Sequence, residues 1–218
     1  MARTNTALEA ALQGRSPAQQ KVIRYFMAPD GCLSKNISDE EYDKLVWDKI
    51  NTLDLKRRAL ARTGLEESQV TEIPPVEFRH WHFGKTALYK RGIDGSFRSS
   101  VYQVSWLFFS GNFVHVYQCT IKMNDNEKEE RVEKYSLRDI SGFSVSLEHE
   151  ETECREPGAL NAASGAGITR HVFYVITPEG KFGCAMVHND ETAGKIQAMN
   201  AKLREKNGRS KAPLVFSE

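Results

Sequence analysis

Two histidines are the first residues whose spacing suggests chemistry. His80 and His82 flank Trp81 in a run of bulky residues, Phe78–Phe83. Side chains at alternate positions of a strand point to the same side, as two metal ligands would. A zinc site needs three or four ligands, however, and no cysteine or acidic residue lies at a recognisable spacing nearby. We therefore interpret the pair as packed or edge-strand residues and expect no metal.

The sequence also gives no sign of a nucleophile or a phosphate loop. The glycine-rich stretch Ser164–Gly167 lacks the glycine two residues before the serine that a nucleophile elbow requires. It leads into a predicted strand, so it lacks the helix dipole that binds phosphate. The cysteines form no C-x-x-C pair, and we expect reduced thiols at Cys32, Cys119, Cys154 and Cys184. The protein is predicted to be non-enzymatic and to need no cofactor.

The charge balance excludes one class of partner. The chain has 30 Lys and Arg against 29 Asp and Glu. A nucleic-acid-binding surface usually needs a marked basic excess, so no nucleic acid is expected as a partner. No stretch approaches the roughly 20 apolar residues of a membrane span, and the N-terminus has no signal-peptide pattern. A cytoplasmic location is expected.

The first 74 residues are predicted to be helical. A capping box at Ser16 opens a short amphipathic helix. A second helix starts at Ser38, where Glu41 completes another capping box, and is predicted to run for about six turns to Gly64. The Pro74-Pro75 pair then ends the helical pattern, and we place a domain boundary there.

The remaining chain changes to strand periodicity. Its strongest signal is a hairpin within Val101–Met123, whose turn is Ser110-Gly111-Asn112. About seven strands are predicted in all, followed by a helix with a narrow apolar stripe. The segments between them, Lys85–Ser99 and Glu148–Gly167, are predicted to be loops, and we expect the second to be mobile. The predicted strands are 78–83, 101–109, 113–121, 131–137, 140–147, 169–177 and 181–187.

This order resembles the pleckstrin-homology (PH) superfold, in its bacterial PH-like and GRAM-like form. The resemblance rests on the strand order and on Tyr135–Ile140, an apolar strand end followed by a short turn into the next strand. It implies an α+β protein in which two nearly orthogonal antiparallel sheets form a β-barrel or sandwich, capped by a C-terminal helix. On this interpretation residues 1–74 are a helical region, 75–207 the PH-like domain and 208–218 a tail.

The resemblance also implies a candidate lipid site. Phosphoinositide-binding members of the family carry basic residues in the first inter-strand loop, and the matching loop here contains Lys85, Lys90, Arg91 and Arg98. The family sets Lys and Arg at alternate positions where its second strand begins, whereas this chain has Ser99–Tyr102 there. Ordinary solvated surface charge is the simpler interpretation of the loop.

Aromatic residues are dense in the central hairpin, and they suggest binding. One face of these strands should fill the core, while the other receives either a peptide or, as we favour, the N-terminal helices. We predict an interaction or docking module whose partner is a protein or peptide, held at a sheet edge or in the groove beside the last helix. Peripheral binding to anionic membrane lipid through the basic loop is the alternative, and the oligomeric state stays open.

Overall fold

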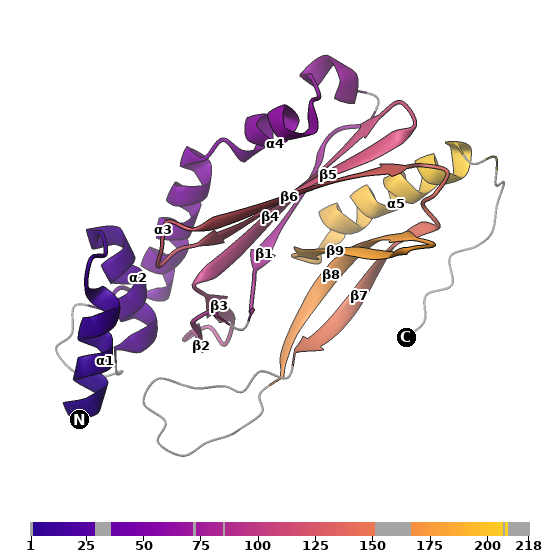
Figure 1. Ribbon diagram of the computed structural model, residues 1–218. Coiled ribbons are helices and arrows are strands. Elements are labelled where there is room, and N and C mark those ends of the chain that lie inside the picture. Colours follow the sequence, from indigo (N-terminus) through magenta and orange to yellow (C-terminus); the bar gives the residue numbers. More distant parts are fainter. Residues whose placement is uncertain are drawn as a thin grey trace.

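The computed structural model describes residues 2–28, 36–71, 73–84, 86–150, 167–206 and 208. Within them the fold is α+β, as predicted (Figure 1). The helices are α1 (Ala2–Leu12), α2 (Pro17–Met27), α3 (Asp39–Thr52), α4 (Leu55–Thr63) and α5 (Asp190–Lys206), with a 3-10 turn, η1, at Glu67–Val70. No helix in the described part of the chain is long and apolar enough to cross a membrane.

The described strands form three antiparallel sheets. A four-stranded sheet has the order β1-β4-β5-β6, a three-stranded sheet has the order β7-β8-β9, and β2 pairs only with β3. The described sheets do not join into a closed barrel, and the predicted PH-like barrel or sandwich is not confirmed. The strands are β1 (Val76–Trp81), β2 (Tyr89–Arg91), β3 (Phe97–Ser99), β4 (Val101–Ser110), β5 (Phe113–Lys122), β6 (Lys128–Ser136), β7 (Gly142–Glu150), β8 (Ile168–Thr177) and β9 (Gly180–Met186).

The strand count differs from the prediction because of the segment expected to be a loop at 85–99. That segment contains β2 and β3, which form a hairpin around the turn at Gly92 and Gly95. Both strands are only three residues long. Such short strands carry no readable alternation of apolar and polar residues, which is why the pattern predicts a loop. The expected mobile loop at 148–167 overlaps the end of β7, and its residues 151–166 lie outside the described part.

The central strand β4 of the four-stranded sheet is buried on both faces. Side chains alternate between the faces of a strand. In β4, Val104 and Phe108 join one apolar cluster, while Leu107 and Phe109 join another. Residues of α2, α3 and α4 complete the first cluster, so the N-terminal helices pack on this sheet, as we favoured. A strand covered on both sides is expected to be apolar at nearly every position. The run Val101–Phe109 in β4 fits this expectation.

The predicted long helix is two helices. The structure ends α3 at Thr52 and starts α4 at Leu55, with Asp54 between them in the left-handed region at φ 44°. Aspartate tolerates this conformation better than most residues do, and its backbone breaks the helix there. The break redirects α4 along the sheet (Figure 1). The spacing of apolar residues is helical on both sides, and it gives no sign of the break.

The second cluster lies between the two larger sheets and α5. Phe173 and Val175 of β8 and Phe182 of β9 are buried there with the apolar stripe of α5, namely Ile196, Met199 and Leu203. The stripe is part of the one predicted from the sequence. The domain boundary near Pro74 stays a prediction, since the first cluster includes residues on both sides of it.

Candidate functional site

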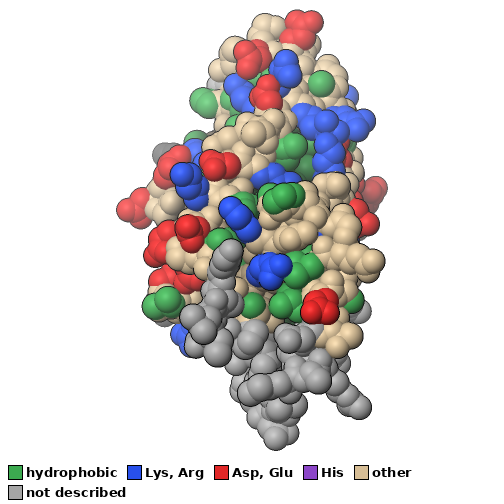
Figure 2. All heavy atoms as spheres, turned by 90° about the vertical axis from the view of Figure 1, so that its left-hand side faces the viewer, with side chains coloured by type: hydrophobic (Ala, Val, Ile, Leu, Met, Phe, Trp, Pro, Cys, Tyr) green, Lys and Arg blue, Asp and Glu red, His purple; other side chains and the backbone are tan. Residues whose placement is uncertain are grey.

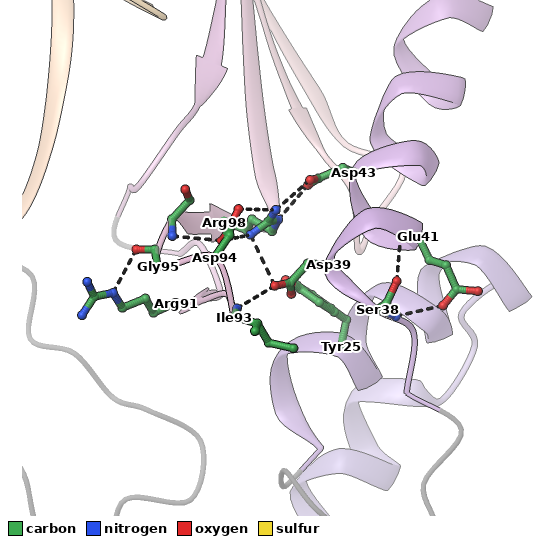
Figure 3. A network of polar contacts seen from close by, with 11 residues as sticks. Tyr25, Ser38, Asp39, Glu41, Asp43, Arg91, Ile93, Asp94, Gly95 and Arg98 are labelled. Atoms are coloured by element: carbon green, nitrogen blue, oxygen red, sulfur yellow. Dashed lines mark hydrogen bonds and ion pairs between the residues drawn. The ribbon is translucent and has the colours of Figure 1, made fainter.

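Arg98, predicted as a phosphate-binding residue, lies inside the protein. Its side chain is 7 % exposed, and it is surrounded by three carboxylates (Figure 3). Two parallel hydrogen bonds of 2.8 Å join its guanidinium to Asp43 of α3. Asp94 accepts two further hydrogen bonds, and Asp39 lies 3.6 Å away. The positive charge of Arg98 is thus already compensated from within the chain.

This network fastens the β2–β3 hairpin to the helices. Asp39, at the start of α3, accepts hydrogen bonds from the Tyr25 hydroxyl of α2 at 2.6 Å and from the Ile93 amide at 2.8 Å. Burial opposes the charge of Asp39, but these hydrogen bonds and the Arg98 charge outweigh it and lower its pKa. Hydrogen bonds from Arg98 and from the Ser96 amide lower the pKa of Asp94 to about 2. Both carboxylates are therefore charged at neutral pH, as the ion pairs require.

Glycine is needed at the turn of the hairpin for reasons of space. A Cβ atom at Gly92 would collide with Arg98, with Asp39 and with Asp94, whose Oδ1 would be 2.8 Å away. The backbone at Gly92 passes directly over the ion-pair network. The turn of the hairpin therefore packs so tightly against Arg98, Asp39 and Asp94 that no side chain fits at Gly92.

The two other basic residues of the predicted site that the structure describes, Lys90 and Arg91, make different contacts. Lys90 lies over the Tyr25 ring, 3.8 Å from its centroid. Arg91 is exposed and donates to the Gly95 carbonyl next to it, while Lys85 lies outside the described residues. On the helical face in Figure 2, basic and acidic side chains of the described residues are interspersed. At the tip of the hairpin, Ile93 is fully exposed beside Arg91.

The histidine pair lies in and just after β1. Burial lowers the pKa of both His80 and His82, so both are neutral at physiological pH. The Nδ1 of His80 is 3.1 Å from the Trp81 carbonyl oxygen. Among the described residues, no three histidine, cysteine or acidic side chains are grouped so that they could hold a metal ion.

The described cysteines are buried thiols. Cys119 and Cys184 are both free. Burial raises the pKa of Cys119, and it raises that of Cys184 to about 12. A thiol with such a pKa is protonated at neutral pH and is a poor nucleophile. Cys32 and Cys154 lie outside the described residues.

The outer edge of β7 is an open sheet edge. β7 is the first strand of its sheet, and among the described strands it pairs with β8 alone. In an antiparallel pair, the backbone groups of alternate residues point toward the partner strand and away from it. Asn200 of α5 bonds both the amide and the carbonyl of Phe143, so this residue faces outward. By the same alternation the backbone groups of Val145 and Leu147 also face outward.

Asn200 acts at one end of this edge as a neighbouring strand would. Its Oδ1 accepts from the Phe143 amide at 3.3 Å, and its Nδ2 donates to the Phe143 carbonyl at 3.2 Å. No such partner bonds the backbone of Val145 or Leu147 on that side within the described part of the chain. The edge of β7 is therefore capped at Phe143 and open further along.

Apolar side chains line the open part of the edge. Val145 packs against the cluster beneath α5, whereas Leu147, two residues on, is 53 % exposed. Side chains two apart in a strand share a face, so Leu147 continues the apolar face beyond the end of the core. The site thus combines unpaired backbone groups with an uncovered apolar side chain, which are the two things an added strand uses.

The sequence interpretation did not single out Asn200 or Leu147. Asn200 follows Ile196 by four residues and so lies on the same helix face. In the sequence, its position beside the apolar stripe is the one sign that it contacts another part of the protein. Leu147 is the last residue of the predicted strand 140–147, where it alternates with smaller residues as Phe143 and Val145 do, and such a pattern indicates a core face. Which strand forms an edge depends on the sheet order, and the sequence pattern does not contain it.

Comparisons with known proteins give no relative. No protein-family model, no curated protein and no solved structure matches the chain.

Proposed function

We propose that the protein is a non-enzymatic, cytosolic docking module that binds an extended peptide at the edge of β7, beside α5. The observation that carries the proposal is the pair of outward-facing residues, Val145 and Leu147, next to the capped residue Phe143. An extended peptide would add to the sheet through main-chain hydrogen bonds, and the exposed Leu147 would favour an apolar side chain opposite.

The proposal includes a PH-like arrangement. Four strands in the order β1-β4-β5-β6 precede three in the order β7-β8-β9 and a last helix, with the β2–β3 hairpin inserted after β1. This order supports kinship with the PH superfold, in which two antiparallel sheets are followed by a C-terminal helix. The groove that we propose lies between the fifth strand of that arrangement and the helix.

A proline scan of β7 tests the docking site. Peptides of about ten residues, long enough to span a strand, would be selected from a displayed library on the immobilised full chain. The strongest would then be measured against the variants Leu147→Pro and Leu147→Ala. Proline removes an amide that faces outward and so leaves the bonds to β8 intact, which edge strands tolerate. Alanine keeps that amide and removes the apolar side chain.

We expect Leu147→Pro to abolish binding and Leu147→Ala to weaken it, with both variants folded by circular dichroism. As a positive control for the geometry, Ser146→Pro removes an amide that faces β8 and should destabilise the sheet. A peptide that binds Leu147→Pro as tightly as the original chain, or a library that yields no binding peptide, would refute the site.

A second candidate function rests on the fully exposed Ile93. Together with Arg91 it forms an apolar and basic tip that could touch an anionic lipid surface. Flotation with anionic and neutral vesicles, at low and high salt, tests this candidate in the chain and in Ile93→Asp. Binding that needs anionic lipid, fades with salt and is lost in Ile93→Asp would favour it over peptide docking.

A further inference from the structure

Two side chains of the four-stranded sheet hold the outer edge of β9. The Ala185 amide donates to the Gln103 Oε1 at 3.2 Å, and the Gln118 Nε2 donates to the Gly183 carbonyl at 3.1 Å. β9 is the last strand of its sheet in the described part of the chain, so its outward backbone groups can make such contacts. Both hydrogen bonds join one sheet to the other, and they break if the two sheets separate here.

Two histidines lie beside this contact on the side of the four-stranded sheet. His80 pairs with Gln103 in the register of β1 and β4. It shares a face with Phe78, whose ring centroid lies 4.7 Å from that of Phe173 in β8, so His80 points toward the three-stranded sheet. His82 follows two residues further on, and its Nδ1 is buried without a hydrogen-bond partner among the described residues.

Two more histidines face them from the other sheet. His171 of β8 pairs with Met186, the residue that follows Ala185 in β9. Its ring stacks on that of His188, with the centroids 4.7 Å apart. Four of the six histidines in the chain therefore lie here, and we name this end of the contact between the sheets the histidine contact.

The histidine contact favours neutral imidazoles. Burial lowers the pKa of His80, His82 and His171 below the usual 6.5. The Trp81 carbonyl, 3.1 Å from the His80 Nδ1, offsets only part of this for the pKa of His80. A histidine that is exposed to water has no such shift, so it binds a proton at a higher pH than it does in the closed contact.

Charged groups on three strands face the cluster. Arg170 of β8 lowers the pKa of His80 and His82 further, and it pairs with Glu148 of β7, 3.5 Å away. Glu129 of β6 acts in the opposite direction on the pKa of His82, but it does not outweigh burial. The histidines also act on one another, since a proton on one imidazole opposes a proton on the next.

The contact between the sheets continues into a part without titratable groups. The Phe173 ring centroid lies 4.7 Å from that of Phe78 in β1 and 5.7 Å from that of Phe143 in β7. All three side chains are buried in the cluster beneath α5. Protonation therefore weakens the histidine contact and leaves the aromatic part unchanged.

We propose that mild acid opens the histidine contact while the aromatic part keeps the two sheets together. The open form binds more protons than the closed form once the pH falls below about 6.5, so its population rises as the pH falls further. Each histidine whose pKa differs by one unit between the two forms multiplies that population by up to about tenfold. The opening is independent of the docking edge, because β7 and β8 stay paired.

Amide exchange measured by NMR on the full chain tests the opening. The Ala185 amide is bonded to Gln103 across the histidine contact, so it reports the opening directly. The Val116 amide lies in β5, a central strand, and reports unfolding of the four-stranded sheet. Protection factors, which are corrected for the direct effect of pH on exchange, would be compared at about pH 7.5 and about pH 5.

We expect the protection factor of Ala185 to fall about tenfold between these pH values, and that of Val116 to stay at least about tenfold higher at both. A protection factor of Ala185 that does not change with pH would refute the inference. Equal protection of Ala185 and Val116 at the lower pH would also refute it, because the whole domain would then open and not one contact.

Glutamine variants test whether the histidines cause the effect. His80→Gln/His171→Gln keeps polar side chains that take no proton, so the fall at Ala185 should shrink to less than about threefold. If the double variant does not fold, His171→Gln alone, at a half-buried residue, should show a fall smaller than that of the original chain.

His115→Gln is the matched control. His115 is buried and burial lowers its pKa, but it lies with Tyr117 on the opposite face of the four-stranded sheet. Its removal should leave the fall at Ala185 as large as in the original chain. An equal fall at Ala185 in His115→Gln and in the His171→Gln variants would refute the role of the histidine contact.

Discussion

The β2–β3 hairpin and the edge of β7 differ in what the rest of the chain supplies to them. The hairpin carries the basic residues that the sequence suggests as a phosphate site. One of them, Arg98, is buried, and three carboxylates compensate its charge. The edge of β7 carries ordinary residues, but backbone groups at Val145 and Leu147 have no described partner on their outer side. The partners of a charged side chain therefore decide whether it is available for binding, whereas an edge strand presents unpaired backbone groups because of its position in the sheet.

The largest expected effect tests whether the Arg98 network is structural. Arg98→Ala would leave Asp39, Asp43 and Asp94 without their shared cation. Removing one partner of a buried ion pair costs about 3–5 kcal/mol, and we expect a loss of that size in the free energy of unfolding. Arg91→Ala, at an exposed residue of the same hairpin, is the control and should change it by less than about 0.5 kcal/mol. Urea unfolding measures both.

If Arg98→Ala and Arg91→Ala lowered the free energy of unfolding by similar small amounts, the ion pairs of Arg98 would contribute little to stability. In that case Arg98 would be available to a phosphate group after all. The contrast between the hairpin and the β7 edge would then disappear. The two regions would have to be compared as alternative binding sites.

Adding one methyl group at a glycine of each region tests how tightly the backbone of that region is packed. Alanine at Gly92 would collide with Arg98 and Asp39, whereas a Cβ atom at Gly142, the first residue of β7, meets no atom within 4 Å. We expect Gly92→Ala to lower the free energy of unfolding by about 1–3 kcal/mol. Gly142→Ala should leave it unchanged or raise it by up to about 1 kcal/mol. Thermal unfolding of the two variants measures the difference, and equal midpoints would contradict it.

Local signals in the sequence predicted much of the fold. Both capping boxes form, since the Ser16 and Ser38 side chains accept from amides three residues on. The central hairpin has its turn where the glycine was expected, and Gly111 adopts a positive φ of 57°. Each of these features depends on residues close together in the chain. Short-range chemistry of this kind can be predicted from the sequence alone.

The features that the sequence did not predict depend on contacts between distant residues or on very short elements. Arg98 meets Asp43 of α3 across 55 positions, and no spacing rule predicts that contact. The break at Asp54 leaves the helical period intact on both sides, so the pattern predicts one long helix. The open edge of β7 follows from the order β7-β8-β9 and from the Asn200 contact with Phe143, which lies 57 positions away. Strand order and tertiary capping therefore had to come from the structure.

The smallest expected effect is a pH dependence that belongs to the hairpin and not to the edge. Asp94 has a folded-state pKa of about 2, below its usual value of 3.8. A lowered pKa adds stability above the unfolded value, and that stability is lost as the pH falls from about 4 to 2. Asp94→Asn lacks this contribution. The original chain should therefore be the more stable of the two above pH 4, and the difference should narrow toward pH 2.

Urea unfolding of both proteins at several pH values between 2 and 6 measures this narrowing, and comparing the two removes the effect of carboxylates they share. Leu147→Ala provides the contrast, because it removes no titratable group. Its stability curve should run parallel to that of the original chain over the same range. If the Asp94→Asn curve ran parallel as well, Asp94 would not be held by Arg98 in solution. The Asp94–Arg98 ion pair would then contribute little to holding the hairpin on the helices.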